Sequence, residues 1–378
     1  MISDLANVVF PWDLLDKYKD IAKKYSEKTG DKIVDLSVGT PVDSVPMVIQ
    51  QSLFSAGDSH AYPKTIGTLD LRNAIADWIN SNCGTCNFDK ENIVPTVGSK
   101  EAVAFLPAML GLTSKDIMVR PKYAYPTYDI GTQVVDCAIL ATDDISDWEN
   151  NKNVKLVWIN SPNNPTGEVK SAHYLQEVIK AARKIGAVVA SDECYAMFVY
   201  DDNYKFNSIL DPKINGGSLE NVLQLYSLSK QMNMAGYRTA WIAGDKTIIT
   251  KMRQIRKHVG LIMPDPIQAA MVEALKDEEN GKKNTKRQQE IYSARHKHLM
   301  RAFVDTGYTV EKSQGALYLW VKVKAKDCWE ELERLANIGI IAAPGVFYDE
   351  SATQYLRVGL TAPDKLIDQA CERILENL

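Results

Sequence analysis

Short runs rich in Val, Ile and Leu recur through the first two thirds of the chain, each too short for a typical helix. They cover residues 117–120, 154–159, 187–191, 221–226 and 239–243. Helical patterns separate several of these runs, for example residues 171–184, which end just before Gly186. Buried strands that alternate with helices predict a mostly parallel sheet flanked by helices, which is an α/β fold.

The pattern changes after Pro266. Residues 267–276 form a helical pattern that continues, with an interruption, through residues 286–303, and strand-like runs follow at 309–312 and 317–323. A second, smaller α+β domain accounts for this change. A length of 378 residues is also more typical of two domains than of one.

Charge and composition favour chemistry on small molecules. The formal net charge is −4 and the charged residues, 24% of the chain, mix both signs, so we expect no surface for nucleic acid or for an anionic membrane. No apolar run is long enough to span a membrane, and the first residues lack the pattern of a secretory signal. Six scattered cysteines are typical of reduced thiols, so we expect a cytoplasmic protein.

Cys83 and Cys86 are the one suggestive pair of cysteines. A structural zinc site needs four ligands, and no second cysteine pair or histidine cluster accompanies this one in the sequence. We therefore interpret the pair as an incidental turn after a helix and expect no metal site.

A lysine in a polar turn is the main candidate for covalent chemistry. Residues 227–230 (Ser-Leu-Ser-Lys) follow a buried-type strand, and Arg238 lies in the glycine-containing turn that comes next. Desolvation lowers the pKa of a lysine, and the neutral amine is the form that attacks an aldehyde to give an imine. The hydroxyls of Ser227 and Ser229 and the guanidinium of Arg238 suit a phosphate group. Taken alone, such a segment more often holds an exposed loop lysine than a reactive Lys230.

Polar groups also follow two other predicted strands. Asp192 comes after the apolar residues 187–190, and Asn164 lies in the turn 160–167 with its two prolines and a glycine. In α/β proteins, ligands bind at the carboxyl ends of parallel strands. A buried Asp192 needs a cationic partner, such as the protonated pyridine nitrogen of pyridoxal 5′-phosphate (PLP), and the rigid turn could present the Asn164 amide to a phenolic oxygen. The alternatives are a helix N-cap and an ordinary turn.

Two further motifs have weak meanings by themselves. Residues 98–100 (Gly-Ser-Lys) precede the helical run 102–110, so that free N–H groups of a helix N-terminus would face an anion. Tyr125 lies in a turn where its ring could stack on a cofactor, although packing is the ordinary role of such a tyrosine. Together, a phosphate cradle, a stacking ring, an amide, a carboxylate and an imine-forming lysine are the set that PLP requires.

With these motifs in this order, the sequence resembles the fold-type I, class I/II aminotransferases over nearly its whole length. The resemblance implies PLP as the cofactor, Lys230 as its Schiff-base lysine and Asp192 as the partner of its pyridinium nitrogen. It also implies that Ser99 and Lys100 form the phosphate loop, that Ser227 and Arg238 bind the cofactor phosphate, and that Tyr62 reaches a phosphate across a dimer interface. Tyr125 would stack on the cofactor ring, and Asn164 and the catalytic Tyr195 would bind its phenolic oxygen. Gly39, Asn164 and Arg357 would bind the substrate.

The resemblance also implies the PLP-dependent transferase fold and a homodimer with shared active sites. Its large α/β domain would have a mostly parallel sheet of the seven-stranded type, flanked by helices. We place this domain at residues 39–262 and the smaller α+β domain at residues 1–38 together with residues 263–378.

A closer similarity is to the actinobacterial N-succinyldiaminopimelate aminotransferases. The strings that carry it are residues 10–13, 35–43, 190–195 and 256–258. It implies ping-pong transamination between N-succinyl-LL-2,6-diaminopimelate and 2-oxoglutarate, in lysine and diaminopimelate biosynthesis. The segment around Lys257 and His258 resembles the stretch from which aspartate aminotransferases supply a substrate arginine across the dimer, and a solvated helix face is an equally good interpretation of both residues.

Several rival functions stay open at this point. An aminotransferase of broad specificity, or a PLP-dependent carbon–sulfur β-lyase, would have the same fold, because the pocket around PLP decides which bond breaks. A non-enzymatic PLP-fold ligand sensor would carry a DNA-binding domain, and no basic helix-turn-helix segment precedes Asp35. A dinucleotide-binding protein would need a G-x-G-x-x-G motif after a first strand, and the sequence has none.

Overall fold

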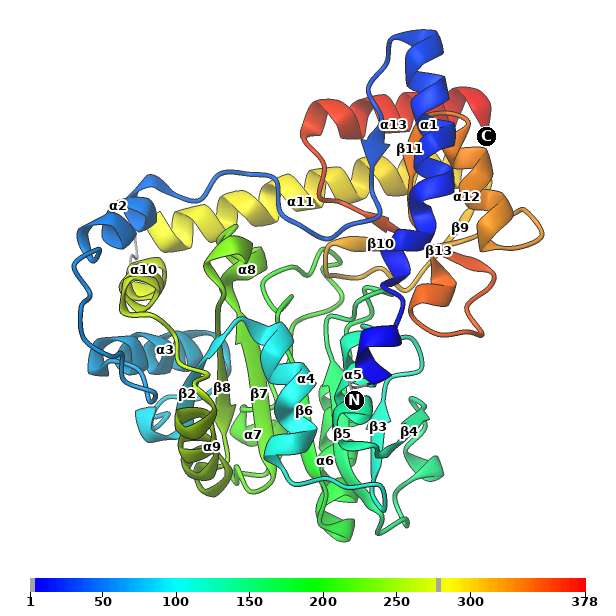
Figure 1. Ribbon diagram of the computed structural model, residues 1–378. Helices are drawn as coiled ribbons and strands as arrows, with labels where there is room; N and C mark the ends of the chain where they lie inside the picture. Colours follow the sequence, from blue (N-terminus) through cyan, green and yellow to red (C-terminus); the bar gives the residue numbers. More distant parts are fainter. Residues whose placement is uncertain (1–3, 277–279) are drawn as a thin grey trace.

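Two sheets of different kinds organise the chain, and the long helix α11 (Asn280–Asp305) extends from one to the other (Figure 1). The computed structural model describes residues 4–276 and 280–378. The predicted interruption of the helical pattern after residue 276 therefore falls partly outside the described residues. The two segments on either side of it are helical, as predicted.

The larger sheet has seven strands. Their order across the sheet is β2 (Ile93–Val97), β8 (Thr239–Gly244), β7 (Val222–Ser227), β6 (Val188–Asp192), β5 (Val154–Asn160), β3 (Ile117–Arg120) and β4 (Ala138–Ala141). β8 runs antiparallel to both of its neighbours, and the other neighbouring pairs are parallel. The predicted mostly parallel sheet is thus confirmed.

The two edge strands, β2 and β4, are the ones that the hydrophobic pattern does not reveal. Pro95 lies within β2 and cannot donate a hydrogen bond to a sheet partner. An edge position tolerates it, because β2 pairs with β8 alone. β4 is an apolar run, Ala-Ile-Leu-Ala, but it is only four residues long and none of its residues is fully buried.

Helices cover both faces of the large sheet. On one face lie α3 (Leu69–Asn82), α6 (Ala172–Ile185) and α10 (Asp265–Lys276), and on the other lie α4 (Ser99–Met109), α5 (Thr127–Val135) and α9 (Lys246–Val259). Successive side chains of a strand point to opposite faces, so Val157 of β5 packs with the first set and Trp158 with the second. α2 (Met47–Ser55) packs against α10, and the short α7 (Pro212–Asn215) and α8 (Leu228–Gln231) precede and follow β7.

Helix α6 shows how local sequence sets an element. Ser171 caps its first turn by accepting a hydrogen bond from the Tyr174 N–H, and Gly186 ends it in the left-handed conformation at φ +73°. Leu175, Val178 and Ala182 recur at helical spacing and are buried against the sheet. The prediction of a helix that closes at Gly186 is confirmed.

The smaller sheet is antiparallel and is covered by helices. Its order is β12 (Ala343–Pro344), β13 (Tyr355–Gly359), β10 (Tyr318–Lys322) and β9 (Thr309–Glu311), and a parallel pair, β1 (Val34–Asp35) and β11 (Ile340–Ile341), lies beside it. Residues of α1 (Asp16–Thr29), α11, α12 (Cys328–Ala336) and α13 (Asp364–Asn377) share its hydrophobic core. The exact division of the chain at residues 38 and 262 stays a prediction.

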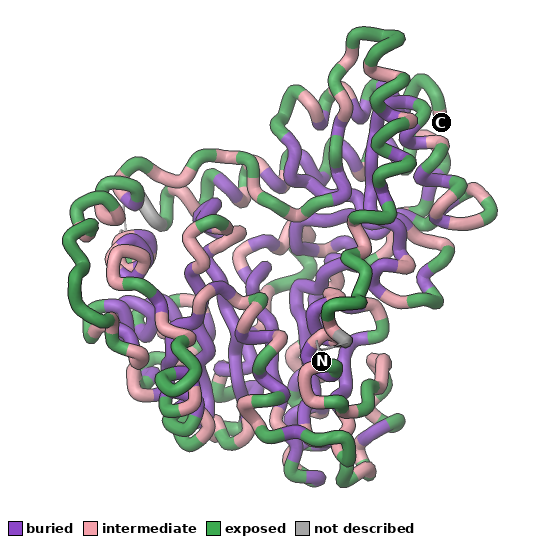
Figure 2. The backbone as a smooth tube through the Cα atoms, in the orientation of Figure 1, coloured by how far each residue is buried: buried purple, intermediate pink, exposed green. Residues whose placement is uncertain are grey.

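Burial is concentrated along the central strands of both sheets, whereas the outer turns of the helices are largely exposed (Figure 2). Cys83 lies in the large core and Cys86 is exposed. Within the described ranges, none of the helices combines the length and the apolar character that crossing a membrane requires.

Candidate active site

A cavity of about 850 Å³ lies at the carboxyl ends of the parallel strands β5, β6 and β7. These strands end in Asn160, Asp192 and Ser227, and all three residues line it. Asn160 and Asp192 are direct neighbours in the sheet register. Other parts of the wall come from helices α4, α5 and α8, from the smaller sheet and from the segment before α1. This is the place in an α/β sheet where ligands are expected.

The cavity brings together all of the predicted site residues except Tyr62. Those that line it are Gly39, Ser99, Lys100, Tyr125, Asn164, Asp192, Tyr195, Ser227, Lys230, Arg238 and Arg357. Tyr62 lies outside this wall with its side chain in solvent, 99% exposed. Its role toward a second subunit stays a prediction. Lys257 and His258 are exposed at the end of α9 and are also absent from the wall.

Lys230 is held by a residue that lies 191 positions earlier in the chain. It lies in α8, which starts directly after β7, and Ser227 caps this helix by accepting a hydrogen bond from the Ser229 N–H. The Lys230 ammonium donates to the carbonyl oxygen of Gly39. A Cβ on Gly39 would come within 2.0 Å of the Tyr318 hydroxyl, so the close approach of these segments requires glycine.

Asp192 forms a buried floor of the cavity. The Tyr128 hydroxyl donates to its Oδ2 over 3.1 Å, and the Cys194 N–H donates to its Oδ1 over 3.2 Å. Burial raises the pKa of the Asp192 carboxyl, and the hydrogen bonds and Lys230 only partly oppose this shift. A cation placed against this carboxylate would favour its charged form. The protonated ring nitrogen of PLP is such a cation.

An anion cradle lies beside this floor, at the N-terminus of α4. Gly98 adopts φ +77°, and a Cβ there would lie 2.2 Å from an Arg238 nitrogen, so only glycine lets the guanidinium approach the helix end. In the described residues, the one hydrogen bond of the Arg238 guanidinium goes to the carbonyl of Ala235 over 2.7 Å. The hydroxyls of Ser227 and Ser229 lie 2.8 Å apart on the same wall. Helix N–H groups, hydroxyls and an arginine suit a phosphate.

The substrate side of the cavity is dominated by Arg357, which is 2% exposed on strand β13. Its guanidinium donates to Asn164 Oδ1 over 3.0 Å and to the Ser37 carbonyl over 2.5 Å, whereas Nε has no partner among the described residues. The guanidinium carbon also lies 4.0 Å from the centre of the Tyr318 ring. A buried arginine that faces a cavity is a strong site for a carboxylate, because its planar fork can bind two oxygens.

The structure adds residues that the sequence patterns do not single out. Tyr318, on strand β10, lies with its hydroxyl 2.9 Å from that of Tyr195. Burial would raise the pKa of the Tyr318 phenol, but Arg357 and Lys230 lower it overall. Trp12 also lines the cavity, 5.8 Å from the Arg357 guanidinium. The strand-like run of residues 317–323 indicated a strand, but no signal showed that Tyr318 faces a site.

The residues present fit PLP. An anion cradle, a buried carboxylate without a cationic partner among the described residues and a lysine line one cavity of suitable size, together with the half-buried ring of Tyr125. Tyr195 and Asn164 bring a hydroxyl and an amide to the same wall.

Known proteins match this chain over almost its full length. The family described as "Aminotransferase class I and II" matches residues 31–374. The 4-dedimethylamino-4-oxo-anhydrotetracycline transaminase OxyQ of Streptomyces rimosus is 40% identical over 365 residues, which cover 97% of this chain and 98% of that protein. An LL-diaminopimelate aminotransferase of Dehalococcoides mccartyi is 29% identical over 376 residues, covering 94% and 95% of the two chains.

The fold is also shared with solved structures. A double mutant of the aspartate aminotransferase of Thermus thermophilus superimposes with a TM-score of 0.88 at 21% identity, covering 100% of both chains. This likeness shows an aspartate-aminotransferase-like fold, which confirms the predicted PLP-dependent transferase fold with its mostly parallel sheet and smaller domain. The family match, which spans most of the residues, decides the class of chemistry. This chain belongs to the class I and II aminotransferases and is a PLP-dependent aminotransferase.

Proposed function

We propose that this aminotransferase takes its amino group from N-succinyl-LL-2,6-diaminopimelate and passes it to 2-oxoglutarate, within lysine and diaminopimelate biosynthesis. The observation that carries this proposal is the distribution of cations around the cavity. Arg357 lies at its buried side, and the exposed Lys19 lines it on the solvent side. A donor with a carboxylate at each end suits this arrangement, since each carboxylate would meet a cation.

In this proposal the described residues divide the work. Lys230 would hold PLP, and its free amine would be the base that moves a proton at the substrate Cα. PLP, when bound, supplies an electron sink that makes the Cα–H bond acidic. Asp192 keeps the ring nitrogen protonated, and Arg357 with Asn164 orients the α-carboxylate. The other proposed cofactor contacts are the α4 N-terminus with Ser99 and Lys100, Ser227, Arg238, Tyr125 and Tyr195.

The assembly and the location are part of the same proposal. Tyr62 would complete the phosphate site of a second subunit in a cytoplasmic homodimer, and its exposed side chain is available for this contact. The proposed domains are residues 39–262 and residues 1–38 with 263–378. Helix α10, which follows residue 262, packs in the core of the large sheet, so the boundary deserves a direct test by limited proteolysis.

The donor is tested by comparing kcat/KM for N-succinyl-LL-2,6-diaminopimelate, free diaminopimelate, glutamate, alanine and aromatic amino acids with a fixed keto acid. We expect the succinylated compound to lead. An advantage of tenfold for alanine or an aromatic donor, about 1.4 kcal/mol of transition-state preference, would contradict the proposed donor. Release of pyruvate or ammonia would indicate a β-lyase instead.

A second candidate substrate class is a bulky, ring-bearing amine, whose keto form would be the amino acceptor in the reverse direction. The observation that favours it is the apolar wall formed by Val8, Val9, Phe10 and Ile130 around the same cavity. The transaminase OxyQ, whose name specifies an anhydrotetracycline substrate, is 40% identical to this chain. The same kinetic comparison, extended to a fused-ring ketone as the amino acceptor, separates the two candidates.

A further inference from the structure

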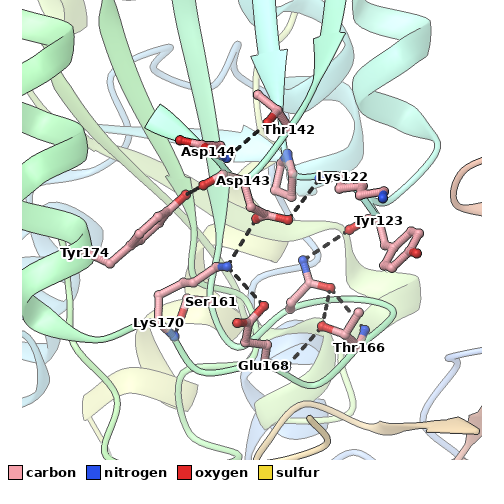
Figure 3. Close-up of polar contacts among 12 residues, drawn as sticks. Lys122, Tyr123, Thr142, Asp143, Asp144, Ser161, Thr166, Glu168, Lys170 and Tyr174 are labelled. Atoms are coloured by element: carbon pink, nitrogen blue, oxygen red, sulfur yellow. Dashed lines mark hydrogen bonds and ion pairs between the residues drawn. The ribbon is translucent and has the colours of Figure 1, made fainter. Parts of the chain in front are cut away.

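A buried lysine outside the cavity joins two segments that carry proposed cofactor contacts. Lys170 follows the turn that contains Asn164, and it is 9% exposed. Its ammonium lies 3.1 Å from Asp143 Oδ1 and 3.0 Å from Glu168 Oε2, and 4.8 Å from the centre of the Tyr174 ring (Figure 3). We call Lys170, Asp143 and Glu168 the ion cluster.

The ion cluster has an additional cation, so it is electrically balanced. Lys312 pairs with Glu168 over 2.8 Å, which gives two ammonium groups for two carboxylates. Burial lowers the pKa of Lys170, but Asp143 and Glu168 raise it more strongly, so that the ammonium stays charged. Tyr174 of α6 adds a hydrogen bond from its hydroxyl to the Asp143 carbonyl over 3.2 Å.

On one side, the ion cluster holds the turn that carries Asn164. The Lys170 N–H donates to Ser161 Oγ over 3.0 Å, and the Glu168 carbonyl accepts from the Asn163 N–H over 3.0 Å. Within the turn, the Asn164 N–H donates to Asn160 Oδ1 over 2.7 Å. The turn is therefore closed at its base by the residues of the ion cluster.

On the other side, the ion cluster holds the segment that leads to Tyr125. Asp143 Oδ2 accepts from the Lys122 N–H over 3.3 Å. The side chain of Asn163 spans the gap between the two segments by donating to the Tyr123 carbonyl over 3.4 Å. Figure 3 shows Lys170 between Asp143 and Glu168, with Lys122 and Tyr123 above the turn.

We infer that Lys170 is a positioning residue, which fixes the Asn164 turn and the Tyr125 segment relative to each other through Asp143 and Glu168. The inference rests on the proposed contacts of Asn164 and Tyr125 with the cofactor. Asn164 also accepts the hydrogen bond of Arg357, so a displaced turn disturbs both the cofactor site and the substrate carboxylate site. A misplacement of a contacting group by about 1 Å is enough to reduce activity strongly.

The test uses Lys170→Met, Lys170→Arg and a control, Arg183→Met. Arg183 also lies on the large domain and donates to the carbonyls of Asn215 and Ser218 over 2.8 and 2.7 Å, away from the turn. We expect Lys170→Met to raise the Kd of the apoenzyme for PLP about tenfold, equal to about 1.4 kcal/mol, and to raise KM for the amino donor more than it lowers kcat. Lys170→Arg should restore PLP binding to within about threefold of wild type.

The control separates positioning from general stability. Arg183→Met should lower the melting temperature of the apoenzyme and leave the Kd for PLP within about twofold of wild type. Hydrogen exchange of the apoenzyme adds a readout without cofactor, since amides of residues 122–125 and 163–168 should exchange faster in Lys170→Met than in the control. Equal PLP affinity in Lys170→Met and wild type, or equal loss in both methionine variants, would overturn the inference.

A double variant keeps the inference testable if Lys170→Met folds poorly. Lys170→Met with Asp143→Asn leaves the Glu168–Lys312 pair balanced, so it should regain stability while PLP stays weakly bound. Wild-type PLP affinity and wild-type exchange in this folded variant would overturn the inference. Asn164→Ala is the positive control: unchanged PLP affinity there would remove the proposed Asn164 contact, while the exchange experiment would still decide whether Lys170 fixes the turn.

Discussion

Asp192 and Glu193 are adjacent in the sequence and both are buried, but they face opposite sides of the large sheet with different partners. Asp192 faces the cavity and receives hydrogen bonds from the Tyr128 hydroxyl and the Cys194 N–H. Glu193 faces away and receives four, from Ser191 Oγ, Ser208 Oγ, the Ile209 N–H and Gln224 Nε2, over 2.7 to 3.0 Å. Neither forms an ion pair with a described residue.

The difference in hydrogen-bond partners indicates a functional site around Asp192 and a structural cluster around Glu193. All partners of Glu193 belong to this chain, and they fasten the segment around Ser208 to strand β7. Asp192 has fewer donors and lies on a wall that is open to a ligand. A buried polar group whose hydrogen bonds within the chain are incomplete is typical of a functional site. A buried group with all of its hydrogen bonds formed within the chain is typical of a stabilising role.

The largest effect should come from Asp192→Asn. This change keeps the shape and removes the charge proposed to hold the PLP nitrogen protonated. We expect turnover to fall by about 10³-fold or more, with an unchanged circular dichroism spectrum, as for a charged member of a coupled catalytic unit. Steady-state kinetics on purified holoenzyme measures this. Turnover within tenfold of wild type would show that the two carboxyls do not differ in function.

An intermediate effect should come from Glu193→Gln, as a change in the pH dependence of stability. Burial raises the pKa of Glu193 from 4.5 to about 7, against the opposing effect of its hydrogen bonds. Between these values the folded protein keeps a proton that the unfolded chain has lost. The contribution of Glu193 to stability is therefore fully present below pH 4.5 and is lost as the pH rises to about 7, with a total on the order of 3 kcal/mol.

Urea unfolding of the apoenzyme between pH 5 and 8 measures this dependence. The glutamine of Glu193→Gln does not titrate, so its contribution to stability does not change with pH. As the pH rises, the wild type should therefore lose unfolding free energy relative to the variant, and this loss should level off above about pH 7. A difference that stays constant across this range would contradict the raised pKa. A large loss of turnover at matched stability would make Glu193 part of the site.

The smallest effect should come from Tyr128→Phe, which removes the hydroxyl that donates to Asp192 Oδ2. The pKa of Asp192 should rise further, because the charged carboxylate loses a donor. We expect kcat to fall about tenfold, or about 1.4 kcal/mol, far less than for Asp192→Asn. A Tyr226→Phe variant is the matched control, since the buried Tyr226 hydroxyl donates to Gln231 Oε1 over 2.7 Å and lies outside the cavity wall. Equal kcat in Tyr128→Phe and wild type would show that the hydrogen bonds from Cys194 are sufficient.

Much of the fold could be predicted because the large sheet repeats a simple pattern. The buried central strands are apolar runs, and the intervening helix α6 carries its own start and stop signals. Edge strand β2 was missed because an edge does not need a free N–H at every position, as its Pro95 shows, and edge strand β4 is a run of only four residues. Strand ends also predicted the site, since parallel strands bring their carboxyl ends to one edge.

The sequence by itself determined which polar groups end strands. Asn160, Asp192 and Ser227 lie together because β5, β6 and β7 are neighbours, and Lys230 follows Ser227 in α8. Only the tertiary structure decided their partners. Arg357 bonds residues 193 and 320 positions away, and Tyr318 meets Tyr195 from the other sheet. Periodicity tells which face of an element is buried, but it does not tell which distant group lies opposite. That choice depends on how the two sheets pack around the cavity.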